Sequence, residues 1–141
     1  MFELQAHADI RVAWALVTTT TTNTTACQDI HLENYRAADL LITAASAAGN
    51  ITVAVSQETA SGLTTGAAGR VALGTAYATT IAAAHVAGNA PALVHVDSSV
   101  LNEAGGFSWI TASVTHAGAD TSVGTWVCYR PRYAPPLNAT V

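Results

Sequence analysis

The chain has no lysine and very little charge of either sign. Its 141 residues include five cationic side chains, all arginine, and nine carboxylates, for a net charge of −4. No basic run is present, which argues against a protein that wraps nucleic acid, because phosphates are contacted mainly by clustered Lys and Arg. A free soluble protein normally carries roughly 25–35% charged residues on its surface, whereas charged residues make up 10% of this chain. We therefore expect much of the surface to contact other protein.

Long hydrophobic runs and cysteines are also scarce. No apolar run approaches the roughly 20 residues that span a bilayer, and the N-terminal "MFELQAHADIRVAW" lacks a basic region followed by an apolar core. These absences predict no membrane partner and a mature chain that begins at Met1 and is made in a cytoplasm. The two cysteines, Cys27 and Cys128, match no metal-ligand spacing. We expect two buried free thiols, no metal and no cofactor.

Alanine and threonine are abundant, with 30 and 20 residues. Threonine is β-branched and favours the pleated surface of a strand. A chain of this length is most simply one domain, residues 1–141, that buries roughly two thirds of its unfolded surface. Composition therefore predicts a single domain built mainly of strands.

Short strand-like runs recur along the chain. In "ITVAVSQ", Ile51, Val53 and Val55 alternate with smaller or polar residues, and with the preceding "ADLLITAAS" and "AAGN" this run predicts a hairpin. Thr18–Thr22 reads as an exposed strand or a loop, and Ser61–Gly69 as a glycine-rich loop. The other predicted strands are "IRVAWALV", "ATTIAAAHV", "ALVHVD", "FSWITASVT" and "SVGTWVCYR", the last two joined at "HAGAD".

Seven or eight short strands separated by turn residues predict an all-β fold. The expected architecture is an antiparallel β-sandwich, jelly-roll-like or immunoglobulin-like. Pro131 cannot donate a hydrogen bond to a strand ladder, and Pro135 and Pro136 follow it. Residues from about 130 to 141 are therefore predicted to form an extended C-terminal arm.

Two pairs of residues could serve acid–base chemistry. His95 and Asp97 lie two apart on a predicted strand and so share a face, and His31 and Glu33 repeat the spacing. A catalytic pair also needs a cleft and a nucleophile or metal, and the chain contains no nucleophile elbow, phosphate-binding loop or zinc-ligand cluster. We interpret these residues as surface or interface side chains and expect no enzyme activity.

Aromatic residues and arginines near the C-terminus predict an interface. Trp109 shares its strand face with Thr111 and Ser113, so it lies on the polar side, whereas Trp126 could face either way. Tryptophan in a sandwich is most often a core residue, but Trp, Tyr and Arg are also enriched at interface hot spots. The predicted interface residues are Trp109, Trp126, Tyr129, Arg130, Arg132 and Tyr133.

The region from "ATTIAAAHVAGNAPALVHVDSSVLNEAGGFSWITASVT" through "YRPRYAPP" resembles the second half of the small capsid cement, or decoration, proteins of tailed bacteriophages. The matching elements are Thr80–Gly88, Leu93–Asp97, Phe107–Thr115 and Val123–Arg132. The resemblance implies a structural virion protein without catalytic residues. Such a protein is assembled in the host cytoplasm, binds the outside of the capsid and contacts the major capsid protein and copies of itself, as a dimer or trimer.

Other functions remain open at this point. A carbohydrate- or receptor-binding sandwich would use an exposed Trp109 or Trp126 to stack on sugar rings. A tail or head-completion protein would share the same composition, and a small hydrolase would use the face that carries His95 and Asp97.

Overall fold

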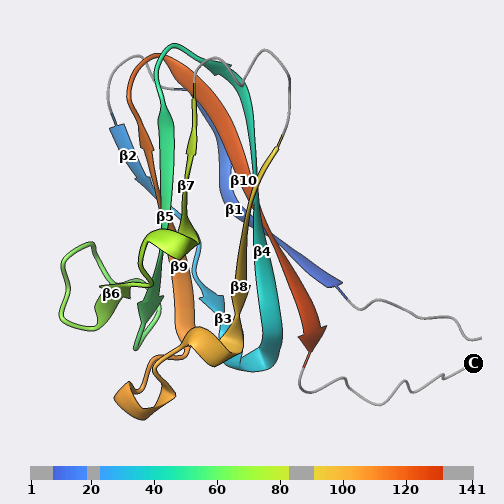
Figure 1. Cartoon of the computed structure of the whole chain (residues 1–141), viewed down its shortest axis with the longest axis vertical. Helices are drawn as coiled ribbons and strands as arrows, with labels where there is room; N and C mark the ends of the chain where they lie inside the picture. The colour runs from blue at the N-terminus through green and yellow to red at the C-terminus, as the bar shows by residue number, and fades with distance from the viewer. Residues whose placement is uncertain (1–7, 19–22, 83–90, 132–141) are drawn as a thin grey trace, which may run out of the picture.

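The computed structural model describes residues 8–18, 23–82 and 91–131, which contain ten β-strands and four short 3-10 helices (Figure 1). The strands are β1 (Ala8–Thr18), β2 (Asn23–Ala26), β3 (Ile30–His31), β4 (Tyr35–Ala47), β5 (Ile51–Glu58), β6 (Arg70–Ala72), β7 (Ala78–Ile81), β8 (Ala92–Asp97), β9 (Trp109–His116) and β10 (Asp120–Pro131). The 3-10 helices are η1 (Leu32–Asn34), η2 (Thr75–Tyr77), η3 (Ser98–Val100) and η4 (Glu103–Gly105).

The strands form two antiparallel sheets. A four-stranded sheet has the order β1-β10-β4-β8, and a six-stranded sheet has the order β2-β9-β5-β6, with β3 also paired to β9 and β7 to β5. Their inner faces enclose one apolar core to which both sheets contribute. The predicted all-β sandwich is therefore confirmed.

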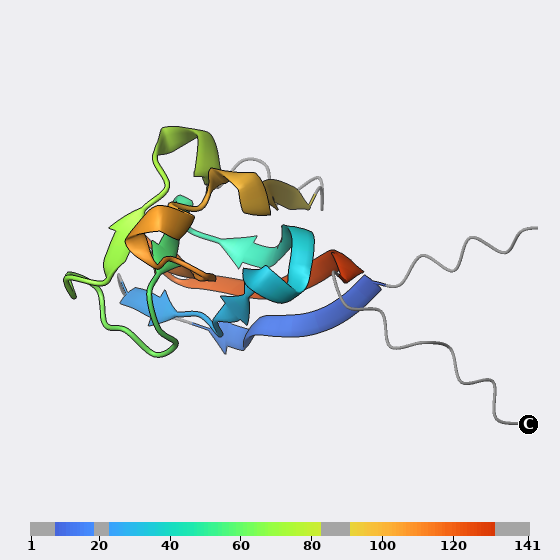
Figure 2. The ribbon, with the colours of Figure 1, turned by 90° about the horizontal axis from the view of Figure 1, so that it is seen from below.

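The pairing follows a regular scheme along the chain. The first strand pairs with the last, β2 and β3 pair with β9, β4 pairs with β8, and β5 pairs with β6 and β7. The chain is thus doubled back on itself, and its closed end is the loop 59–69 between β5 and β6. Successive pairs alternate between the two sheets. In Figures 1 and 2 β1 and β10 lie side by side, and the loop 59–69 projects on the other side of the molecule.

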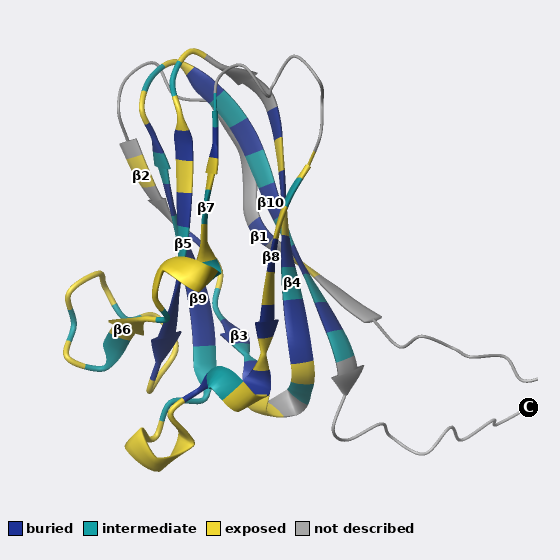
Figure 3. Cartoon of the chain, viewed as in Figure 1, coloured by how far each residue is buried: buried dark blue, intermediate teal, exposed yellow. Residues whose placement is uncertain are grey.

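Alternation of side chains places the core as the sequence predicted. Ile51, Val53 and Val55 of β5 are buried, and in β8 Val94 and Val96 are buried while their neighbours are exposed. Figure 3 shows this alternation along β5 and β8. A period of two is what a strand requires when one of its faces is buried.

The predicted hairpin between "ADLLITAAS" and "ITVAVSQ" is wrong. Both segments are strands, but β4 lies in the four-stranded sheet and β5 in the six-stranded sheet, so the connection crosses the core. The buried Leu40 and Ile42 of β4 and the buried residues of β5 belong to the same core cluster from opposite layers. A period of two identifies the buried face of a strand but does not say whether the next strand pairs beside it or packs across from it.

A buried carboxylate, Asp120, holds this crossing together. It accepts hydrogen bonds from the backbone N–H groups of Ala48 at 2.7 Å and Gly49 at 3.1 Å, and from Gly118 at 3.2 Å. The β4–β5 and β9–β10 connections therefore lie against each other. A methyl group at Gly49 would come within 2.9 Å of Ala117 Cβ, so the close approach requires glycine there.

The predicted C-terminal arm was placed too early in the chain at its start, residue 130. Arg130 and Pro131 belong to β10, and Pro131 is the register partner of Tyr35 on β4. Proline is tolerated at the end of a strand, where the ladder stops. The rest of the predicted arm, residues 132–141, lies outside the described residues, as do residues 19–22 of the threonine run and residues 83–90.

Candidate functional site

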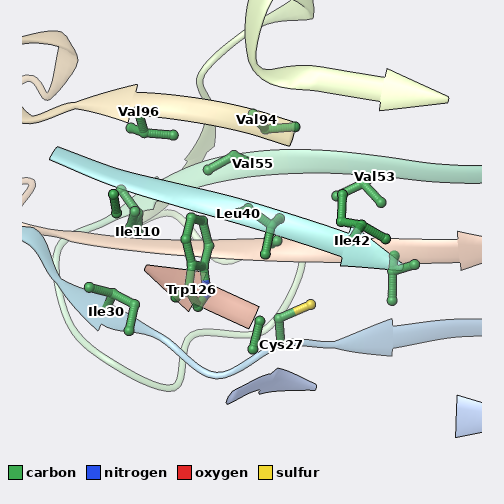
Figure 4. Close-up of a cluster of buried hydrophobic side chains, with 14 of the residues drawn as sticks. Cys27, Ile30, Leu40, Ile42, Val53, Val55, Val94, Val96, Ile110 and Trp126 are labelled. Atoms are coloured by element: carbon green, nitrogen blue, oxygen red, sulfur yellow. The ribbon is translucent and has the colours of Figure 1, made fainter. Parts of the chain in front are cut away.

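Trp126 is a core residue, which corrects its prediction as an interface residue. Its side chain is 0% exposed, and Figure 4 shows it within the core cluster beside Leu40, Ile30 and Ile110. Its indole N–H donates to the backbone oxygen of Gln28 at 3.2 Å. The ring packs inward because it shares a strand face with the buried Cys128. Cys27 and Cys128 are both buried and are not joined in a disulfide, as predicted.

Tyr129 lies on the opposite face of β10, away from the core. It is half-buried, and its hydroxyl group bonds to Asp39 of β4. That hydrogen bond, followed by burial and the charge of Asp39, raises the pKa of the Tyr129 hydroxyl. Asp39 also contacts His95 of β8, with 2.5 Å between His95 Nδ1 and Asp39 Oδ1. One carboxylate therefore joins side chains of three neighbouring strands.

Two leucines are exposed next to this group. Leu41 of β4 and Leu93 of β8 are register partners and are 36% and 57% exposed. We call the residues Asp39, Leu41, Leu93, His95, Val127 and Tyr129 the outer face of the four-stranded sheet. On this face two exposed leucines lie beside a hydrogen-bonded polar group.

His95 and Asp97 are both exposed on β8, in keeping with their interpretation as surface side chains, and each bonds to a different group. His95 bonds to Asp39, while the Asp97 carboxylate accepts the backbone N–H of Ser99 at 2.8 Å and caps η3. Asp39 was not among the predicted site residues, because its partner His95 is adjacent in the sheet but distant in the chain. Its place between the inward-facing Ala38 and Leu40 was the signal that it pointed outward.

His31 and Glu33 do meet, on the six-stranded sheet. His31 Nε2 lies 3.1 Å from Glu33 Oε2, and the His31 ring stacks on Trp109 with centroids 4.4 Å apart and planes 18° apart. Trp109 is half-buried on the outer side of β9, whereas Ile110 and Ala112 face the core. The prediction that Trp109 lies on the polar side is confirmed, and the side chain that it covers is His31.

The stacked rings border a small pocket at the edge of the sandwich. The pocket has a volume of about 180 Å³ and opens where β1 of one sheet meets β3 of the other. We call it the edge pocket, and it is lined by Arg11, Gln28, Asp29, Ile30, His31, Tyr35 and Trp109.

A buried ion pair lies farther along the same sheet. In register across β3, β9, β5 and β6 stand His31, Trp109, Glu58 and Arg70. The side chains of Glu58 and Arg70 are 0% and 6% exposed and lie 3.4 Å apart. Arg70 also donates to Ser113 Oγ at 2.7 Å and to the Leu63 oxygen at 3.0 Å. Burial, then the nearby Asp29, raises the pKa of the Glu58 carboxyl, and Arg70 acts against them.

The chain matches no protein-family model, and it has no significant match among curated proteins. The resemblance noted in the sequence therefore rests on the residues quoted for it.

Two further observations concern the described residues. Within ranges 8–18, 23–82 and 91–131 no group of three His, Cys, Asp or Glu side chains is placed to hold a metal ion. The same part of the chain has no helix with the length and apolar character needed to cross a membrane. Of the remaining predicted interface residues, Arg130 is described by its backbone alone, and Arg132 and Tyr133 lie outside the description.

Proposed function

We propose that the protein is a structural virion protein that decorates the outside of a phage capsid and stabilises contacts between major capsid proteins. Its partners would be the major capsid protein and further copies of itself, as a dimer or trimer on the shell. The role is non-enzymatic and uses neither cofactor nor nucleic acid.

The outer face of the four-stranded sheet carries this proposal. Leu41 and Leu93 expose apolar surface side by side, and Tyr129 adds an aromatic ring whose hydroxyl is already bonded to Asp39. Because that polar group is satisfied within the protein, covering it with a partner leaves no hydrogen bond of Tyr129 broken. Protein interfaces combine such an apolar and aromatic centre with a polar rim.

The order of strand pairing supports a finer assignment of the fold as a jelly roll. A jelly roll is an eight-strand sandwich in which a doubled chain is wrapped so that successive pairs alternate between two sheets. Counting β2 with β3 and β6 with β7 as interrupted strands gives eight positions and that pairing order. Jelly rolls occur in viral capsid proteins and in lectins, so the architecture agrees with the proposed role without specifying it.

Many weak contacts would suffice for this role. A decoration protein occupies many equivalent sites on one shell, and multivalent attachment through linked copies raises the effective concentration at each site. A modest apolar face on each copy is therefore enough for stable attachment to the shell.

Copy number tests the proposal directly. In particles purified from the phage that encodes the chain, quantitative mass spectrometry should find this protein at about the abundance of the major capsid protein, because each lattice position offers a site. A few copies per particle would indicate a tail or head-completion protein. Absence from the particles would refute a virion role.

A paired substitution tests the face itself. Leu93→Asp places a charge in the proposed contact and should reduce capsid occupancy at least about tenfold, since burying an unpaired charge is costly. Val71→Asp is the matched control, because Val71 is 44% exposed on β6 of the other sheet. Equal occupancy of the two variants would show that the outer face is not the contact.

A further inference from the structure

We propose that the edge pocket binds a single pyranose sugar ring. This inference concerns residues outside the outer face and does not depend on the proposed capsid role. Its volume of about 180 Å³ is smaller than the roughly 300–1,000 Å³ of pockets for drug-sized ligands. The pocket therefore suits one small ring, such as the terminal unit of a glycan.

The aromatic wall supplies an apolar surface for such a ring. Trp109 and His31 stack nearly parallel, and the 3.1 Å contact of His31 with Glu33 fixes the imidazole. His31 covers one face of the Trp109 indole, so a pyranose would pack the C–H groups of one of its faces on the remaining exposed surface of the stacked pair. A rigid platform costs little conformational entropy on binding.

Asp29 supplies a preorganised acceptor for sugar hydroxyl groups. Its Oδ2 accepts Ser61 Oγ at 3.0 Å and the backbone N–H of Gly62 at 2.5 Å, both from the loop 59–69. Gly62 has φ of 80°, the left-handed conformation that glycine allows, and this aims its N–H group at the carboxylate. Because both bonds fall on Oδ2, Oδ1 remains to accept a ligand hydroxyl.

Gln28 and Arg11 complete the polar lining. The Gln28 backbone is fixed between the sheets, because its N–H donates to the Ala13 oxygen at 2.7 Å and its oxygen accepts the Trp126 indole. Its exposed amide side chain can both donate and accept, and Arg11 brings donors from β1. The lining holds one arginine and one aspartate, so their formal charges cancel, which favours a neutral polyol over a charged ligand.

Saturation-transfer NMR on the intact protein tests this proposal. The probes are the methyl glycosides of glucose, galactose and mannose, and N-acetylglucosamine, each at millimolar concentration. At least one should receive saturation from the protein. The signal should disappear in Trp109→Ala and fall at least fivefold in Asp29→Asn, which keeps an oxygen for the loop bonds. Leu93→Asp on the outer face should leave the signal unchanged.

Folding of each variant is checked by circular dichroism. Should Trp109→Ala fail to fold, Gln28→Ala replaces it, because the Gln28 side chain is exposed and its truncation spares the core. No saturation of any of the four sugars would overturn the proposal. A signal that persists in every folded pocket variant would overturn it as well, because binding would then lie elsewhere.

Discussion

Glu58 is the least expected side chain in the structure at the scale of single residues. It lies on the outer side of β5, where the strand pattern predicts exposure, yet it is 0% exposed. Arg70 reaches it from β6 and also donates to the oxygen of Leu63 in the loop 59–69. The ion pair therefore helps to hold the loop near the sheet.

Removing one member of this ion pair should lower the free energy of unfolding far more than removing both members. Arg70→Met should lower the free energy of unfolding by about 3–5 kcal/mol, because a buried carboxylate is left without its counter-charge. Adding Glu58→Met should restore much of the loss. Urea titrations of the two single variants and the double variant measure the coupling. A double variant as unstable as Arg70→Met alone would contradict this account.

The Arg70→Met deficit should also depend on pH. The pKa of Glu58 is raised in the folded protein above its ordinary value of 4.5, so the folded state binds a proton more readily than the unfolded state. The contribution of Glu58 to stability is therefore fully present below that value and is lost as the pH rises through the folded pKa. Arg70 lowers the pKa of Glu58, so Arg70→Met raises that pKa further. The stability that Arg70→Met loses relative to the unsubstituted protein should therefore shrink as the pH falls from about 7 toward 4.5.

Cys27 gives a second pH dependence, at the alkaline end. Burial raises the pKa of its thiol from 9.0 to about 12. Above pH 9 the unfolded chain loses this proton while the folded chain keeps it, so the stability due to the neutral thiol is lost as the pH rises. One group of this kind removes about 1.4 kcal/mol between pH 8 and pH 10. Thermal melts of Cys27→Ala should show a correspondingly smaller change over that interval, and an identical change would contradict the assignment.

The β4–β5 and β9–β10 connections matter most at the scale of elements. Each carries the chain from one sheet to the other, and the three backbone N–H groups that bond to Asp120 come from both connections. The same end of the core holds a buried contact of 2.8 Å between His116 of β9 and Ser122 of β10. The backbone N–H groups of the two connections are thus hydrogen-bonded by a side chain at the same end of the sandwich.

Asp120→Ala should destabilise the sandwich by about 1–3 kcal/mol, because three backbone N–H groups lose a charged acceptor but belong to exposed or half-buried residues that water reaches. Asp120→Asn keeps one oxygen and should lose less. Urea unfolding gives the magnitudes, and hydrogen exchange should locate the change at residues 48–50 and 117–118. Equal stability of the alanine and asparagine variants would show that the backbone bonds contribute little.

These elements also show how far the sequence could predict the structure. Periodicity identified the longer strands and the buried face of β5, because burial of one face imposes a period of two on the sequence. It did not identify the short strands β2 and β6. It could not show that β4 and β5 pack across the core, nor that Asp39 meets His95, because pairing joins residues far apart in the chain. Trp126 was ambiguous for a related reason: both faces of β10 carry similar residues, and the surrounding core decides which one is buried.

At the scale of the whole molecule, the sandwich offers two different surfaces. The outer face of the four-stranded sheet exposes leucine beside a hydrogen-bonded polar group, while the edge pocket gathers polar side chains around stacked rings. The first suits a protein partner and the second a small polar ligand, so one copy could engage both at once.

Under the proposed capsid role, occupancy through the outer face should depend weakly on salt. Apolar contact is not screened by ions, whereas interactions between exposed charges fade beyond about 10 Å at 0.1 M ionic strength. Occupancy measured by sedimentation with capsids should therefore change less than about twofold between 0.05 M and 0.5 M NaCl. A tenfold decrease would indicate that charged residues dominate the contact.

The doubled-back pairing of the strands has a consequence for the order in which the protein folds. Contacts around the loop 59–69 join residues close in the chain, whereas Ala8 must find Tyr129 near the other end. Closing a short loop costs less entropy than closing a long one, so β5, β6 and β7 are suited to pair early. The later pairs then form at progressively greater separation, and such non-local topologies fold slowly. While β1 and β10 are still unpaired, their long edges are the part of the nascent chain most prone to pair with another molecule.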